Sequence, residues 1–232
     1  MSGTTKKVAA AVGTTLAPKL VDLAPGVSSN VVQTALHRAI AGVGPLPGAA
    51  AAAEKQLEEQ RGNRSRAVRE VIENHVAYAS ANGFATNLGG LVATAFMLPA
   101  NVTGLALIEC RMVAGIAHLR GYDLDDPRVR AAILVTLLGE ERVNRQIRRK
   151  KLPAPPMAIA TAPVHDPDLD RIVAAEVTGE LIARVAGKRL ATVVGRRVPI
   201  VGGVVGAGVD GWDSFKVGRY AARELLPRAA RQ

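Results

Sequence analysis

The hydrophobic positions along the chain recur at the three- and four-residue spacings of amphipathic helices. Residues 66–82, for example, place their apolar side chains on one helical face: Val68, Val71, Ile72, Val76 and Ala79. Similar spacing, with cap residues and breaks at glycine and proline, predicts helices over 30–41, 49–60, 66–82, 86–98, 100–120, 127–150, 168–195 and 199–226. No segment has reliable strand alternation. The pattern predicts an all-α fold, a compact multi-helix domain of about seven or eight helices.

A long run without charge lies at the centre of this pattern. From residue 74 to residue 108 the sequence contains no Asp, Glu, Lys or Arg, and Pro99 divides the run. Because proline disfavours helical backbone at the residue before it, we expect helices 86–98 and 100–120 to form a central apolar hairpin that turns near Pro99. Each half is short for a membrane span, which needs roughly 20 apolar residues. The hairpin is therefore either buried in protein or in contact with lipid.

Two further signals divide the second half of the chain. Asp126 followed by Pro127 is a typical helix start, because aspartate caps the helix and proline fits its first turn. We expect this helix to run unbroken to residue 150. Five prolines between residues 153 and 167 then predict a linker before the next long helix.

Charge and composition narrow the class of protein. Lys and Arg number 30 and Asp and Glu number 20, so the net charge of +10 favours an anionic partner, either nucleic acid or a membrane surface. A generally solvated basic surface is the alternative. Aromatic residues make up only 3%, so the core must consist of small aliphatic side chains. A single cysteine excludes an internal disulfide and fits a reducing cytoplasm.

The basic residues gather in two clusters beside apolar helical segments. We expect them to contact an anionic surface, and they are Arg142, Arg145, Arg148, Arg149, Lys150, Lys151, Lys188, Arg189, Arg196 and Arg197. Each basic group near an anionic lipid surface contributes about 1 kcal/mol. Nucleic-acid binding is less favoured, because the sequence lacks aromatic stacking platforms and any clear helix-turn-helix or zinc module.

One acidic residue stands inside an apolar stripe. On the helix 100–120, Glu109 shares a face with Leu105, Ile108, Met112 and Ile116, so we expect these four side chains to be buried and Glu109 to be paired or protonated. A structural ion pair is favoured over a general base. A buried polar cluster of Glu109, His118 and Asp210 around one cavity would indicate an enzyme instead. The sequence predicts no catalytic residue, metal site or cofactor.

Two motifs resemble the EcsC-like family of bacterial proteins. Residues 98–139 carry a Leu98-Pro99 start, the run RMVAGIA at 111–117 and the turn Gly121-Tyr122-Asp123. Residues 198–221, VPIVGGVVGAGVDGWDSFKVGRYA, are similar to the other hallmark of that family. The resemblance covers roughly residues 65 to 225. We therefore expect an N-terminal helical extension over 1–62 and an EcsC-like helical domain over 63–232.

The resemblance implies a cellular setting rather than a reaction. Members of that family are all-helical and intracellular and are often treated as membrane-associated, and the name comes from linkage to a transporter operon involved in secretion. It implies a non-catalytic cytoplasmic protein at or near the inner membrane face, accessory to transport or secretion. Its partner would be an anionic lipid surface or a membrane protein complex. Two alternatives stay open: a small-molecule or lipid-binding enzyme with a pocket between the hairpin and the C-terminal helix, and a basic nucleic-acid-binding protein.

Overall fold

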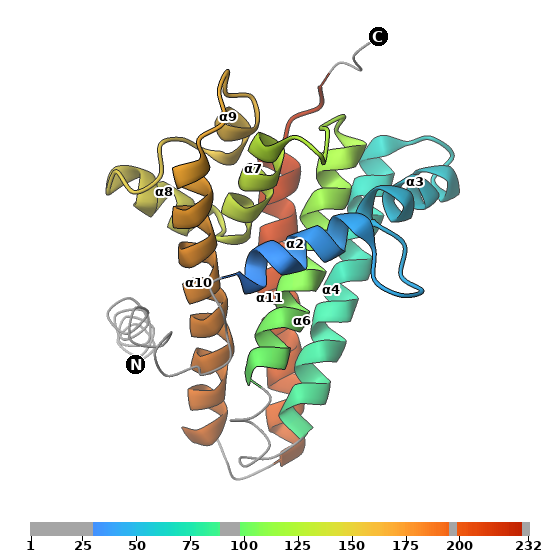
Figure 1. The fold of residues 1–232 in the computed structure, drawn as a ribbon. Coiled ribbons are helices and arrows are strands. Elements are labelled where there is room, and N and C mark those ends of the chain that lie inside the picture. The colour runs from blue at the N-terminus through green and yellow to red at the C-terminus, as the bar shows by residue number, and fades with distance from the viewer. Residues whose placement is uncertain (1–29, 89–97, 195–198, 229–232) are drawn as a thin grey trace.

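The structure, a computed structural model, describes residues 30–88, 98–194 and 199–228 (Figure 1). Over these residues it contains helices and no strand, which confirms the predicted all-α multi-helix domain. The helices are α2 (Val31–Ala41), α3 (Ala49–Glu59), α4 (Arg64–Leu88), α6 (Leu98–Leu119), α7 (Pro127–Leu137), α8 (Glu140–Arg148), α9 (Pro156–Ala160), α10 (Pro167–Val194) and α11 (Pro199–Glu224).

Helices α4 and α6 lie side by side and antiparallel (Figure 1), and we call this pair the central hairpin, with α4 as its first arm in place of the expected 86–98. The expected helix boundaries are wrong here. Helix α4 does not end at residue 82 but passes through Gly83 to Leu88, because its packing against α11 outweighs the roughly 1 kcal/mol cost of a helical glycine. The remainder of the expected 86–98 helix, 89–97, lies outside the described residues. Helix α6 begins at Leu98, so Pro99 occupies its first turn, where proline is tolerated.

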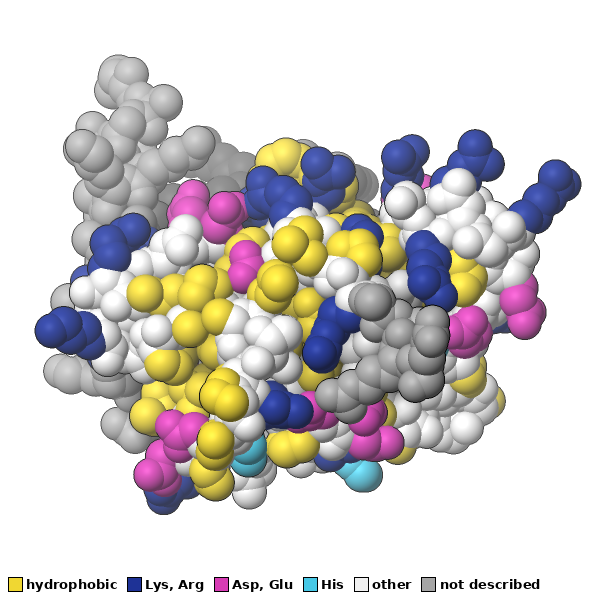
Figure 2. Space-filling model, turned by 90° about the horizontal axis from the view of Figure 1, so that it is seen from above, with side chains coloured by type: hydrophobic (Ala, Val, Ile, Leu, Met, Phe, Trp, Pro, Cys, Tyr) yellow, Lys and Arg dark blue, Asp and Glu magenta, His cyan; other side chains and the backbone are white. Residues whose placement is uncertain are grey.

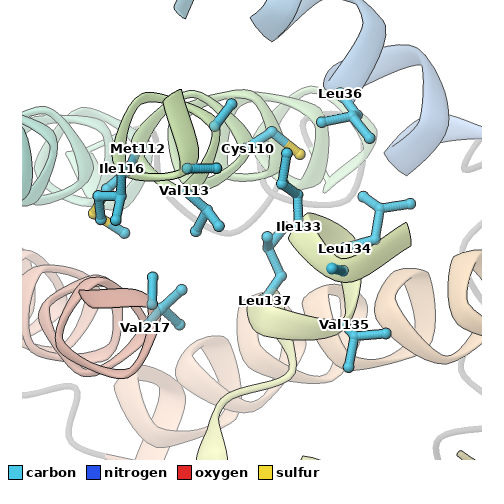
Figure 3. Close-up of a cluster of buried hydrophobic side chains, with 14 of the residues drawn as sticks. Leu36, Cys110, Met112, Val113, Ile116, Ile133, Leu134, Val135, Leu137 and Val217 are labelled. Atoms are coloured by element: carbon cyan, nitrogen blue, oxygen red, sulfur yellow. The ribbon is translucent and has the colours of Figure 1, made fainter. Parts of the chain in front are cut away.

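Helix α6 lies at the centre of the hydrophobic core, in contact with α2, α3, α4, α7, α10 and α11. Figure 3 shows part of this core, which joins α6 to α7 and α11 through Met112, Val113, Ile116, Ile133, Leu137 and Val217. Leu105, Met112 and Ile116 are buried as expected. Ile108 is only half-buried, because it lines a pocket rather than the core.

Helices α7, α8 and α9 lie at the upper end of α10 in Figure 1. Asp126 caps α7 as expected, since its Oδ1 accepts a hydrogen bond from the Arg128 backbone N–H at 2.9 Å. The expected unbroken helix 127–150 is wrong. Gly139, with φ of +76°, ends the first helix, and α8 begins at the next residue. The expected linker also contains the short helix α9.

Helices α2 and α3, expected in an N-terminal extension, pack against α6. Figure 1 shows α2 crossing in front of α6, with α3 to one side. The approach of α3 is close: a methyl group at Gly115 on α6 would lie 3.7 Å from the Ala53 Cβ and 3.5 Å from a Val71 methyl on α4. These helices therefore share the core of the main domain.

Candidate functional site

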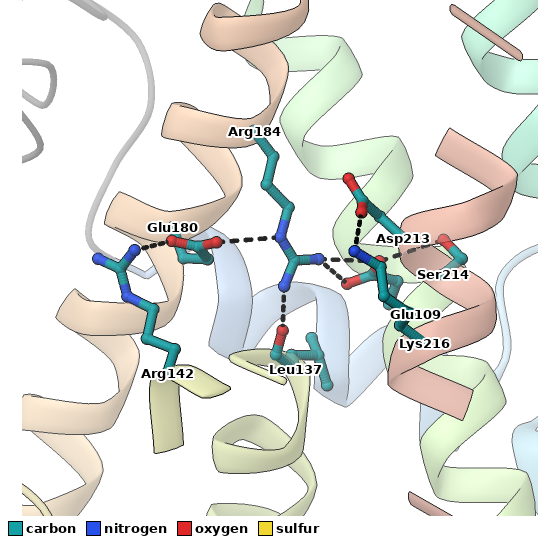
Figure 4. Close-up of polar contacts among 8 residues, drawn as sticks. All are labelled: Glu109, Leu137, Arg142, Glu180, Arg184, Asp213, Ser214 and Lys216. Atoms are coloured by element: carbon teal, nitrogen blue, oxygen red, sulfur yellow. Dashed lines mark hydrogen bonds and ion pairs between the residues drawn. The ribbon is translucent and has the colours of Figure 1, made fainter. Parts of the chain in front are cut away.

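A polar network crosses the interior of the bundle at Glu109 (Figure 4). Glu109 on α6 is fully buried, and Arg184 on α10 donates from its Nη1 to both Glu109 carboxyl oxygens at 3.1 Å. The Ser214 hydroxyl on α11 donates to Glu109 Oε1 at 3.2 Å. The expectation that Glu109 needs a partner is met by an ion pair from one helix and a hydroxyl from another.

Arg184 extends this network to two more helices. Its Nη2 donates to the Leu137 carbonyl at the end of α7 at 2.5 Å, and its Nε donates to Glu180 at 3.2 Å. Glu180 in turn forms an ion pair with Arg142 of α8. Burial by itself would lower the pKa of Arg184, but the carboxylates of Glu109, Glu180 and Asp213 hold that pKa above its ordinary value. The guanidinium is therefore a permanent cation inside the bundle.

The network suits holding helices together better than acid–base chemistry. The Arg184 guanidinium has protein acceptors on three sides: Glu109, Glu180 and Leu137 (Figure 4). A general base needs a stable pKa near the working pH and access to a substrate, whereas Glu109 is enclosed by protein and bonded to a cation. We interpret the Glu109–Arg184 pair as a structural clamp.

The other two members of the expected polar cluster do not join Glu109 in the described structure. His118 lies more than two turns further along α6, where its Nε2 is 2.6 Å from the Glu54 carboxylate of α3. Asp210 is in α11, and its side chain lies outside the described residues. Within the described part of the chain, no three His, Cys, Asp or Glu residues gather as metal ligands. Cys110 is buried, and burial raises the pKa of its thiol, which makes it unreactive.

The predicted basic residues lie in two separate places. Arg142 and Lys151 form ion pairs with Glu180 and Glu176, which ties α8 to α10. Arg148, Arg149 and Lys150 are exposed and have no ion-pair partner among the described residues, while Arg145 is half-buried. Lys188 and Arg189 are on the lower part of α10, although their side chains lie outside the described residues. Arg196 and Arg197 also lie outside the described residues.

Two hollows border the hairpin. One, of about 280 Å³, lies between α3, α4 and α6 and is mostly apolar, with His75 and Arg111 in its lining. The other is an open depression between α4 and α11, in the region of the pocket that one alternative function predicts. Its lining residues are Val76, Ser80, Gly211, Trp212 and Phe215. Neither Glu109 nor His118 lines either hollow. Sequence reasoning missed the first one, although a histidine inside a charge-free run was a usable signal.

Glycines bring α4 and α11 close together and fix their register. A methyl group at Gly218 would lie 3.0 Å from Ile72 of α4 and from Met112 of α6. One at Gly211 would lie 3.5 Å from Val76 and would clash with the Ser80 hydroxyl. Ser214, between these glycines, is level with Glu109 of α6. The three helices are therefore aligned, with Gly218 on one side of the Glu109 level and Gly211 on the other.

This register gathers charge-free segments of four helices at one end of the bundle. Beyond the Glu109 level, the following ranges contain no Asp, Glu, Lys or Arg: 74–88 of α4, 98–108 of α6, 190–194 of α10 and 199–209 of α11. We call these four described segments the charge-free end; they lie at the lower end in Figure 1, and Arg196 and Arg197 stand between α10 and α11 in the sequence. Viewed from the opposite end, in Figure 2, the molecule carries both basic and acidic side chains around apolar ones.

Two exposed aromatic residues stand at the border of the charge-free end. Trp212 is 61% exposed, and its ring stacks on that of Phe215 with centroids 5.8 Å apart. Among the described residues, one helical segment, Ala100–Leu119, is long and apolar enough to cross a membrane, and 67% of its most apolar window is buried in the protein. Because so much of this window is buried, the segment fits the core helix of a protein as well as it fits a membrane span.

Comparison with known proteins identifies one family. Residues 51–228 match the EcsC protein family, a range that begins within α3 and ends at the last described residue. Neither curated proteins nor solved structures include a match.

Proposed function

The chain belongs to the EcsC protein family, and we propose that it is a non-catalytic protein that docks reversibly on the cytoplasmic face of a membrane. The observation that carries the proposal is the charge-free end. Segments distant in sequence become charge-free toward the same end of the bundle, after Glu73 on α4 and Arg189 on α10, and before Glu109 on α6 and Asp210 on α11. A soluble bundle has no need to remove charge from every helix at one end, because exposed charges there are freely solvated.

The length of these segments favours insertion into one leaflet rather than a full span. The charge-free part of α11 rises about 16 Å at 1.5 Å per residue, which is close to half of a hydrocarbon core of about 30 Å. Trp212 would then stand at the level of the lipid headgroups, where tryptophan is enriched in membrane proteins. Helix α6 would keep most of its surface against protein.

The two predicted basic clusters are not equivalent in this orientation. Lys188 and Arg189 are four and five residues beyond Arg184 on α10, so they stand at the border of the charge-free end. The α8 cluster is tied to Glu176 and Glu180, which places it about 12 to 20 Å further up α10. Lys188 and Arg189 would therefore meet anionic headgroups, whereas Arg148 and Arg149 would remain in water or meet a protein partner.

The single tryptophan provides a direct test. We expect vesicles with anionic lipid to shift Trp212 emission to shorter wavelength, and lipids brominated near the headgroup to quench it more strongly than lipids brominated near the chain end. A matched control, Trp212→Phe with Leu226→Trp, moves the probe to an exposed residue just past the C-terminal end of α11, where we expect no quenching.

Other outcomes would contradict the proposal. Equal quenching of both probes would exclude end-on docking. Absence of vesicle binding, combined with salt-sensitive binding to duplex DNA, would favour the nucleic-acid alternative.

A further inference from the structure

The hollow between α3, α4 and α6 has the composition of a small-ligand site. Its volume is about 280 Å³, near the lower end of the usual range for ligand pockets. Most of its wall is aliphatic, from Leu46, Ala49, Ala52, Ala53, Val71, Leu107 and Ile108. Such a wall offers van der Waals contact and almost no hydrogen bonding, so it suits an aliphatic chain better than a polar ring.

His75 lines this pocket and carries a buried hydrogen-bond acceptor. Its Nδ1 is 2.7 Å from the Val71 carbonyl oxygen, and because a carbonyl only accepts, Nδ1 must carry the proton. Burial lowers the pKa of His75 to about 4, so the ring is neutral at physiological pH and Nε2 holds a lone pair. That Nε2 is buried and has no hydrogen-bond partner among the described residues. A buried acceptor of this kind normally finds a donor, from water or from a ligand.

Arg111 supplies a cation to the same pocket. Its Nη1 donates to the Pro47 carbonyl at 2.5 Å, which fixes the guanidinium beside the loop that precedes α3. Arg111 and His75 both line this pocket, and the charge of Arg111 adds to the effect of burial in lowering the pKa of His75. A guanidinium has five N–H donors, and this bond occupies one of its nitrogen atoms.

We propose that this pocket binds a single-chain amphiphile whose polar end carries both an anionic oxygen and a hydroxyl group. The anionic oxygen would accept from Arg111, the hydroxyl would donate to His75 Nε2, and the aliphatic chain would lie against the alanine and leucine wall. A 3-hydroxyacyl carboxylate has this chemistry. This inference does not rest on membrane docking, since the pocket is lined by α3, α4, α6 and the loop before α3, with His75, Leu107 and Ile108 at the border of the charge-free end.

Calorimetric titration with four matched probes tests each part of the proposal. We expect 3-hydroxydecanoate to bind saturably at one site per chain. Decanoate lacks the hydroxyl, 1,3-decanediol lacks the anion, and 3-hydroxybutyrate lacks the chain. Each should bind at least tenfold more weakly than 3-hydroxydecanoate.

Variants assign the recognition to residues. His75→Leu should abolish the preference for 3-hydroxydecanoate over decanoate, and Arg111→Met should abolish the preference for 3-hydroxydecanoate over the diol. His75→Leu removes an unsatisfied buried polar atom, so it should fold at least as well as the original chain. Ala52→Leu provides a steric test, because it places a larger side chain in the pocket lining without changing either polar group. This variant should weaken the binding of all four probes. Thermal melting should show that each variant is folded.

Three results would overturn the proposal. Equal affinity for decanoate and 3-hydroxydecanoate would mean that His75 recognises no hydroxyl. An unchanged preference in His75→Leu would place the hydroxyl elsewhere. No saturable binding of 3-hydroxydecanoate at millimolar concentration would mean that water alone satisfies Nε2.

Discussion

At the residue scale, the Glu109–Arg184 pair shows how a fully buried charge is tolerated. Removing a carboxylate from water is costly, and attraction to a buried cation offsets that cost only with good geometry and further hydrogen bonds. Both conditions are met: Arg184 contacts both carboxyl oxygens, and Ser214 donates to one of them. Because the partners come from α6, α10 and α11, the pair also fixes how these helices sit against one another.

Replacing only one member of the Glu109–Arg184 pair should lower the free energy of unfolding far more than replacing both members together. Arg184→Met leaves Glu109 buried without its cation, and we expect the free energy of unfolding to fall by about 3 to 5 kcal/mol. The double variant Glu109→Leu with Arg184→Met removes both charges and should recover most of that loss. Urea denaturation of the two variants measures the difference. A loss below about 1 kcal/mol in Arg184→Met would show that the pair contributes little.

The apolar stripe of α6 was sufficient to predict that Glu109 is buried and needs a partner, but not which partner. Arg184 is 75 residues away along the chain and sits among the apolar residues of α10. Only the packing of α6 against α10 brings them together, and helical periodicity carries no information on helix pairing. The same limit applies to His75 and Arg111. Each lies on the face of its helix that meets α3, and although Arg111 begins the RMVAGIA motif, no spacing in the sequence links it to His75.

At the scale of elements, the sequence predicted helix ends correctly where the start or stop signal is strong, and incorrectly where the signal is a single glycine within a helical pattern. Asp126-Pro127 starts α7, and Gly121 ends α6 with φ of +82°, both as expected. Gly83 and Gly139 look alike in sequence, yet α4 continues through the first and the chain breaks at the second. The difference arises from tertiary contacts, because α4 packs along α11 there, whereas Gly139 adopts a left-handed backbone conformation that turns the chain into α8.

The close contact between α4, α6 and α11 yields a test with a built-in control. A methyl group at Gly218 would meet Ile72 and Met112 at 3.0 Å, so Gly218→Ala should lower the unfolding free energy by about 1 to 3 kcal/mol. Gly179 on α10 has no described atom within 4 Å of the equivalent position. Gly179→Ala should therefore raise stability by about 0.5 to 1 kcal/mol, because alanine is the better helix former. Equal effects in denaturant titrations would contradict the close packing at Gly218.

At the scale of the whole molecule, the important property is the alignment of charge-free segments from several helices at one end of the bundle. The sequence showed a charge-free run at 74–108 and another at 198–209, but not that both would lie at the same end. Their alignment depends on the antiparallel register of α4 and α11, set by Gly211 and Gly218. The family match spans most of this bundle, and α2 and α3 complete its core from the N-terminal side. The described helices thus carry no charge at one end of the bundle, where Arg196 and Arg197 stand between α10 and α11 in the sequence, and charges of both signs at the other end (Figure 2).

This difference between the two ends of the bundle predicts that removing two positive charges near the charge-free end weakens membrane binding more than removing two from α8. Lys188→Gln with Arg189→Gln removes two positive charges at the border of the charge-free end, and Arg148→Gln with Arg149→Gln removes two from α8. With anionic vesicles in 0.1 M salt, we expect the first pair to weaken binding by about 2 kcal/mol and the second to have little effect. The difference should vanish at 1 M salt, where the Debye length falls from about 10 Å to about 3 Å. Cosedimentation with vesicles measures both, with circular dichroism as a check on folding. A larger effect from the α8 pair would mean that the bundle lies along the membrane with α8 facing it, rather than standing on its charge-free end.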